Sequence, residues 1–200
     1  MSVTNEGYKI YSDLPFDIKQ ILKKRTLLAS FGPASKDEQI VFGSQMPGYG
    51  ARSIPETVIK RWVLFMKDKG IKRVCSLLAQ SQLGYYLVDL LAVYKREFGE
   101  DHVLHVPVED YCLCNKEQLR RILLFLKESD EKGEPVVVHC AGGRGRTGFV
   151  HAAWLVQGRG FFVEEALEAV KAMGRNPLEA IEQGNASAGQ LYTLISQKLI

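Results

Sequence analysis

The segment that decides the fold reads VVVHCAGGRGRTG and runs from Val136 to Gly148. Its three valines predict a short strand that is wholly buried. The helix that should follow, over Thr147–Gln157, is apolar on nearly every side, which is typical of a helix in a protein interior. The segment therefore predicts a central strand, a glycine-rich loop and a central helix.

Strand and helix patterns alternate on either side of this segment. A capping box of Ser53 and Glu56 should start the first helix. Such alternation implies an α/β fold, with a central, mostly parallel sheet flanked by helices. We expect extended segments at Gln39–Phe42, Lys72–Leu78 and His102–Val108, and helices at 55–70, Leu83–Phe98, Lys116–Glu128, Val163–Met173 and Ala188–Leu199.

Length and composition are those of an ordinary globular protein of 200 residues, 46% of them hydrophobic. The formal net charge of +3 is too weak to indicate a nucleic-acid partner. The sequence shows no signal peptide and no apolar run of the roughly 20 residues that a membrane span needs. Four cysteines in a chain of this size are typical of reduced intracellular thiols. We expect a cytoplasmic monomer in which residues 1–39, which carry no motif, pack as an N-terminal extension on a domain of residues 40–200.

The loop after the central strand has the residues of an anion site with a nucleophile at its entrance. Its glycines let backbone N–H groups turn inward, and the positive end of the following helix points at the same place. Arg146 adds a permanently charged fork suited to phosphate oxygens. We expect the Cys140 thiol to ionise readily beside these groups and to attack phosphorus, with the Thr147 hydroxyl stabilising the thiolate.

His139-Cys140, five further residues and Arg146-Thr147-Gly148 resemble the signature of cysteine-dependent phosphatases, the tyrosine and dual-specificity superfamily. The resemblance implies a metal-independent, cofactor-free phosphomonoester hydrolase that forms a phosphocysteine intermediate. Phosphorylated proteins are the first expected substrates; phosphoinositides or other phosphorylated small molecules, and a phosphate-binding module without turnover, are the alternatives. His139 would order the loop, and the phosphate would be held by Ala141, Gly142, Gly143, Arg144, Gly145 and Arg146.

A proton donor for the leaving group should lie at the same edge of the sheet as Cys140. Functional loops of an open α/β sheet gather beyond the carboxyl ends of its strands, and Asp110 follows the extended segment His102–Val108. Asp101 precedes that segment, and we place Asp89 inside a helix. In the family that this sequence resembles, the acid precedes the cysteine by about thirty residues, as Asp110 does. We therefore choose Asp110 over its neighbour Glu109.

Several other residues carry weaker expectations. Arg144 could engage a second phosphate, and Cys75 lies where related lipid phosphatases have a cysteine that traps the oxidised nucleophile as a disulfide. Cys112 and Cys114 are too few to indicate a metal. The segment Arg175-Asn176-Pro177 could line the substrate entrance. Further candidates near the site are Gln183 or Gln190, to position water, and a recognition loop at Met46–Tyr49.

Overall fold

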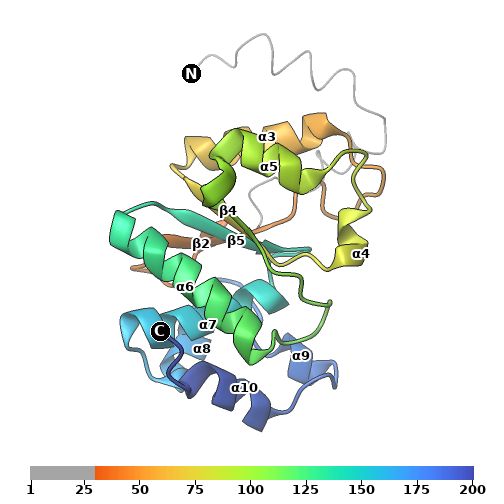
Figure 1. The fold of residues 1–200 in the computed structure, drawn as a ribbon. Helices are drawn as coiled ribbons and strands as arrows, with labels where there is room; N and C mark the ends of the chain where they lie inside the picture. Colours follow the sequence, from red (N-terminus) through yellow and green to blue (C-terminus); the bar gives the residue numbers. More distant parts are fainter. Residues whose placement is uncertain (1–29) are drawn as a thin grey trace.

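A five-stranded sheet forms the centre of the molecule in the computed structural model, which describes residues 30–200 (Figure 1). The strand order is β1-β2-β5-β3-β4, and only β1 runs antiparallel to its neighbour. This confirms the expected α/β fold with a mostly parallel sheet. The strands are β1 Gly32–Pro33, β2 Val41–Gln45, β3 Arg73–Ser76, β4 Val103–His105 and β5 Val136–Cys140.

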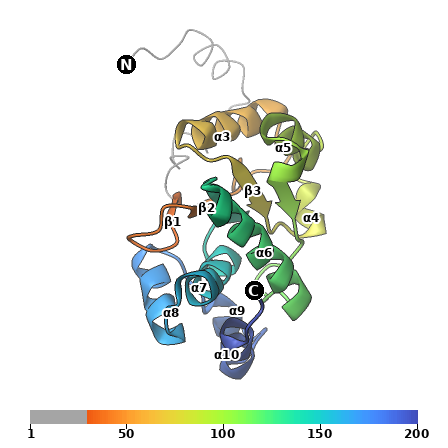
Figure 2. The ribbon, with the colours of Figure 1, turned by 60° about the vertical axis from the view of Figure 1, so that its left-hand side comes forward.

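Helices cover both faces of the sheet, as Figures 1 and 2 show. On one face lie α3 (Glu56–Asp68) and α5 (Leu90–Phe98), which pack on Val74 and Val137. The other face carries the longer series around the central helix α7, and it covers Val136, Val138 and Cys140. Alternate residues of β5 thus supply two separate cores, as a strand that is buried on both faces requires. The second series is α6 (Lys116–Lys132), α7 (Gly145–Arg159), α8 (Val163–Ala172) and α10 (Ala188–Ser196).

Two local expectations are wrong. The helix expected over Leu83–Phe98 starts only at Leu90, as α5, and Leu83 is the last residue of a separate short helix, α4 (Gln80–Leu83). Asp89, which we placed inside the helix, is instead the N-cap of α5 and accepts hydrogen bonds from Leu91 N and Ala92 N. The chain between them leaves the helical path in a turn at residues 84–85, and Tyr86 then forms an isolated parallel bridge with Ile54, with hydrogen bonds from Ile54 N to Tyr85 O and from Leu87 N to Ile54 O. The predicted capping box is also absent: Pro55 is the N-cap of α3, and Ser53 has a positive φ of 52°.

The register of the parallel strands brings their carboxyl ends to one edge. Gln45 pairs with Cys140, and Ser76 pairs with both His139 and His105. The loops that leave β2, β3, β4 and β5 therefore emerge side by side, and α4 and the start of α7 lie at the same edge. This arrangement positions the candidate site.

The first described residues are tied into this domain. Strand β1 extends the sheet beyond β2, and the buried carboxylate of Glu38 accepts hydrogen bonds from Trp154 and Arg159 near the far end of α7. The part of the expected extension that covers residues 1–29 lies outside the described residues. Within residues 30–200, no helix has the length and apolar character needed to cross a bilayer.

Candidate active site

The loop over residues 141–146 joins β5 to α7 and lies against the end of β2. Met46 N donates to Ala141 O at 3.0 Å. Gly143 has φ of +70°, and a Cβ there would lie 2.5 Å from the carbonyl carbon and oxygen of Ser44. The loop therefore needs glycine at this position to approach β2 so closely. Cys140, the last residue of β5, is buried at the base of the loop with 3% of its surface exposed.

Arg146 is held in one orientation by acceptors from three other segments. Its Nη1 donates to Val108 O at 2.8 Å, to Gln82 Oε1 at 2.9 Å and to Leu77 O at 3.3 Å. Its Nη2 donates to Asp110 Oδ1 at 2.8 Å. Only 4% of the surface of Arg146 is exposed, so its side chain is not free to change orientation. This pre-organisation suits a fork that binds an anion at a fixed place.

Asp110 is the carboxylate that the structure brings to this arginine. Gln82 Nε2 donates to its Oδ2 at 3.3 Å, and Tyr111 N donates to its Oδ1 at 3.2 Å. The side chain is 44% exposed, so it borders solvent as well as Arg146. Its neighbour Glu109 is exposed. The ion pair therefore keeps the Asp110 carboxylate beside the Arg146 guanidinium.

His139 lies behind the loop and is fully buried. Its Nε2 is 3.2 Å from Tyr94 Oη, its Nδ1 is 3.4 Å from Cys140 O, and its ring packs edge-on against Trp62 and Tyr94. Burial lowers the pKa of His139 to about 3. The imidazole is therefore neutral at ordinary pH, and its place is structural, beside the backbone of Cys140.

The Thr147 hydroxyl is buried in the first turn of α7. Its Oγ1 has no hydrogen-bond partner among residues 30–200. A buried hydroxyl is costly to leave unpaired, so this one is available to a group that the resting site does not supply. The thiolate role expected for Thr147 stays a prediction.

Arg175 lies behind the loop, so the expectation that the 175–177 segment lines the entrance is wrong for this residue. The side chain is buried, its Nη1 donates to Gly143 O, and its Nη2 donates to Ser30 O at 3.2 Å and Gly32 O at 3.0 Å. Burial lowers the pKa of this arginine to about 10. Arg175 thus ties the 141–146 loop to the edge strand β1.

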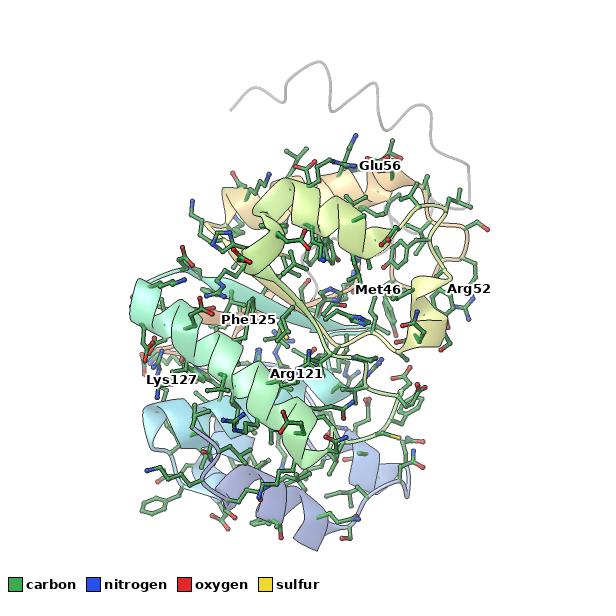
Figure 3. The ribbon with its side chains drawn as sticks, in the orientation of Figure 1. Met46, Arg52, Glu56, Arg121, Phe125 and Lys127 are labelled. Atoms are coloured by element: carbon green, nitrogen blue, oxygen red, sulfur yellow. The ribbon has the colours of Figure 1, made fainter. Side chains whose placement is uncertain are left out.

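Of the remaining candidates, the two glutamines lie at helix ends and the Met46–Tyr49 segment lies beside the 141–146 loop. Gln190 closes the capping box of α10 with Ser187, which is a structural role, and Gln183 is exposed at the end of α9 (Glu179–Glu182). The Met46–Tyr49 segment does lie beside the loop: a Cβ on Gly142 would be 3.3 Å from Tyr49 Oη. Met46 itself is buried near the end of the sheet (Figure 3).

The three cysteines besides Cys140 differ in burial: Cys75 and Cys114 are buried and Cys112 is partly exposed. All four cysteines are free thiols. Burial raises the pKa of Cys75, and it raises that of Cys114 to about 12. Among the described residues, no group of three or more His, Cys, Asp or Glu side chains could hold a metal ion. The disulfide between Cys75 and Cys140 stays a prediction.

Sequence reasoning missed two residues of this site, Gln82 and Glu179. Gln82 bridges Arg146 and Asp110 from α4, a helix that the sequence pattern merges with α5. Glu179 belongs to the four-residue helix α9, and its carboxylate lies against the start of α7, where a Cβ on Gly145 would be 1.8 Å from Glu179 Oε2. Neither residue lies in a motif, and only the tertiary fold brings them to the loop.

Comparison with protein families gives a match across the site. The model of the family described as "Polymorphic toxin system, DSP-PTPase phosphatase" matches residues 50–159. Two uncharacterized proteins of Methanocaldococcus jannaschii are each 47% identical to this chain over 51 residues, which is 26% of this chain. The chain matches about a third of the length of these relatives, 35% of one and 32% of the other.

Solved structures resemble a larger part of the chain. The crystal structure of Tk-PTP in its active form is 26% identical with a TM-score of 0.59, over 78% of this chain and 97% of that chain. Kinase associated phosphatase is 20% identical with a TM-score of 0.62, over 82% of this chain and 90% of that chain. PTPMT1 in complex with PI(5)P is 18% identical with a TM-score of 0.58, over 84% and 92%. The last two likenesses concern the fold.

Proposed function

This chain belongs to the DSP-PTPase phosphatase family, and we propose that it hydrolyses phosphate monoesters of proteins, on tyrosine, on serine and threonine, or on both, through a phosphocysteine intermediate. One observation carries the proposal. The buried fork of Arg146 is bonded to the carboxylate of Asp110 at 2.8 Å, and Cys140 ends β5 at the base of the loop that leads to this arginine. These are the oxyanion clamp, nucleophile and proton donor that displacement at phosphorus needs.

The reaction proceeds in two displacements. The Cys140 thiolate attacks phosphorus, the P–S bond forms, and the P–O bond to the leaving group breaks while Asp110 gives its proton to the leaving oxygen. Water then attacks phosphorus and passes a proton to Asp110, and the P–S bond breaks to regenerate the thiolate. Arg146 and the backbone of residues 141–146 hold the phosphoryl oxygens in both steps. In the structure Arg146 Nη2 is bonded to Asp110, so a bound phosphate has to replace or share that contact.

The test is phosphate release by wild type, Cys140→Ser and Cys112→Ser. The substrates are an aryl phosphate, phosphotyrosine and phosphothreonine peptides, and a set of phosphoinositides. We expect wild type and the control Cys112→Ser to turn over and Cys140→Ser to lose all measurable turnover, with the peptides preferred to the lipids. Residual turnover in Cys140→Ser contradicts the mechanism, and phosphate binding without turnover in wild type indicates a binding module.

Phosphoinositides are the second candidate because Arg144 is exposed at the N-cap of α7, where a second phosphate could reach it. Glu179 faces the same arginine and offsets part of its charge. We therefore rank proteins first. If phosphoinositides are the better substrates and Arg144→Ala removes only their turnover, the order of the two candidates is reversed.

A further inference from the structure

Gln82 is a buried amide that contacts two residues of the proposed machinery at once. Its Oε1 accepts a hydrogen bond from Arg146 Nη1 at 2.9 Å, and its Nε2 donates to Asp110 Oδ2 at 3.3 Å. Asp110 Oδ1 in turn accepts from Arg146 Nη2 at 2.8 Å, so the three side chains form a closed ring. Only 6% of the Gln82 surface is exposed. A buried polar side chain that is bonded at both ends is fixed in one orientation.

The two ends of this amide cannot be exchanged. Arginine has only donors, so the amide oxygen has to face Arg146, and the amide nitrogen is left to face the carboxylate of Asp110. The backbone N–H of Ala79 also donates to Oε1, at 3.1 Å, at the start of the same helix. Gln82 therefore presents a donor to Asp110, and Asp110 Oδ2 has to accept it. A proton carried by this acid then belongs on Oδ1, the oxygen on the side of Arg146.

The contact of Gln82 with Asp110 matters most when phosphate occupies the arginine. The proposed reaction requires a phosphate oxygen to replace or share the bond between Arg146 Nη2 and Asp110. Arg146 keeps its two backbone acceptors in that state. Asp110, whose side chain is 44% exposed, would keep the bonds from Gln82 Nε2 and Tyr111 N, its other hydrogen bonds to residues 30–200. Gln82 is thus the side chain that can hold the carboxylate beside a bound phosphate.

We propose that Gln82 is a positioning residue that acts through Asp110 and holds this leaving-group donor beside the phosphoryl group after phosphate has displaced it from Arg146. The inference rests on the proposed function. No proton passes through Gln82, because a carboxamide neither gives up nor takes one at ordinary pH. Its contribution is orientation, and a misplacement of a reacting group by about 1 Å costs on the order of 100-fold in rate. The contribution should therefore be visible where the leaving oxygen needs the proton.

The experiment measures kcat/KM of wild type and Gln82→Met across aryl and alkyl phosphates of graded leaving-group pKa. Methionine has a similar length and removes the hydrogen bonds of the amide. We expect kcat/KM to fall about 10–100-fold for alkyl phosphates and less than about threefold for activated aryl phosphates. The inhibition constant of inorganic phosphate should stay within about threefold of wild type, because Arg146 keeps its backbone acceptors.

The ratio of alkyl to aryl turnover within one variant does not depend on how much of the protein is folded, so a partial loss of folding cannot imitate the effect. Gln82→Asn supplies the same ratio should Gln82→Met fail to fold. Its amide is one CH₂ shorter and cannot span Arg146 and Asp110 as glutamine does, so we expect its ratio to fall in the same direction.

The double variant with Asp110→Asn tests whether Gln82 acts through this carboxylate. The acid is absent from that background, so we expect Gln82→Met to cost less than about threefold more on alkyl phosphates. Gln80→Met is the matched control, since Gln80 is exposed on the same helix, and its ratio should equal that of wild type. An equal loss on every substrate, or losses that add in the double variant, overturn the inference. If wild type has no turnover that depends on Cys140, the proposed function fails instead, so the two failures are distinguishable.

Discussion

Gly143 shows how one residue sets the shape of the 141–146 loop. Its left-handed backbone and its approach to the Ser44 carbonyl leave no room for a side chain, and the obstructing atoms are backbone atoms that cannot turn aside. Gly142 differs, because a Cβ there would meet only the end of the Tyr49 side chain, at 3.3 Å.

We expect Gly143→Ala to lower kcat/KM at least about tenfold, since a left-handed alanine costs roughly 1–2 kcal/mol before the collision is counted. Gly142→Ala should keep kcat/KM within a few-fold of wild type. Steady-state kinetics on an aryl phosphate, with the melting temperature of each variant, separates lost activity from lost folding. Equal losses in the two variants would show that the φ of Gly143 is not the deciding feature.

Asp110 can be tested by the chemistry of the leaving group. An alkoxide needs a proton as it departs, whereas a nitrophenolate barely does. We expect Asp110→Asn to reduce turnover of alkyl phosphates by about 10²–10⁴ and that of activated aryl phosphates far less. The measurement is kcat/KM across aryl and alkyl phosphates of graded leaving-group pKa. A uniform loss across the series would rule out the acid role.

At the scale of elements, the far end of α7 is held by Glu38. This carboxylate has 1% of its side chain exposed, and it accepts bonds from Trp154 Nε1, Arg159, Ile40 N and Val41 N. The arginine and these hydrogen bonds lower the pKa of Glu38 even though burial opposes them. The chain before β2 is thereby fixed to the central helix.

We expect Glu38→Ala to lower the free energy of unfolding by about 3–5 kcal/mol, because it leaves several buried donors unpaired. Asp37→Ala is the control, since Asp37 is exposed. Urea denaturation of both variants gives the comparison. A loss below about 1 kcal/mol for Glu38→Ala would mean that water replaces the carboxylate.

The elements that sequence could predict are those whose pattern is local. Helix α6 repeats its buried leucines and isoleucine at helical spacing, and β5 is a run of valines. The chain between α4 and α5 pairs with Ile54, which is distant in sequence, and α9 is too short to have a period. The same limit applies to the site. The Cys140 to Arg146 spacing is local, and the placing of Asp110 follows from the sheet edge. Gln82 and Glu179 lie in the four-residue helices α4 and α9, which are too short for a sequence pattern to locate.

For the whole molecule, buried histidines set the dependence of stability on pH. Burial lowers the pKa of His139 from 6.5 to about 3 and holds that of His151 well below 6.5. Below pH 6.5 the unfolded chain binds protons that the folded protein excludes, so stability is full above that pH and is lost as pH falls toward 3. Carboxylates such as Glu38 and Asp130, whose pKa values are lowered, add to the loss only below about 4.5.

Between pH 6.5 and 4.5 we expect the free energy of unfolding to fall by up to about 1.4 kcal/mol per pH unit for each buried histidine. His139→Gln and His151→Gln should each remove about half of that combined slope, whatever their effect at pH 8. Urea denaturation at half-unit pH steps measures it. A slope that neither variant changes would show that these imidazoles can take up protons in the folded state.

Arg175 links the start of the described chain to the 141–146 loop. Its guanidinium donates hydrogen bonds to the carbonyls of Gly143, Ser30 and Gly32. The same side chain therefore binds both the 141–146 loop and the segment around the edge strand β1. A protease that cut between β1 and β2 and released the first strand would leave every reacting group in place, yet it would remove two of the three acceptors. We expect such a cut to weaken phosphate affinity from a distance, which would mean that the proposed activity depends on residues outside the 50–159 stretch that carries the family likeness.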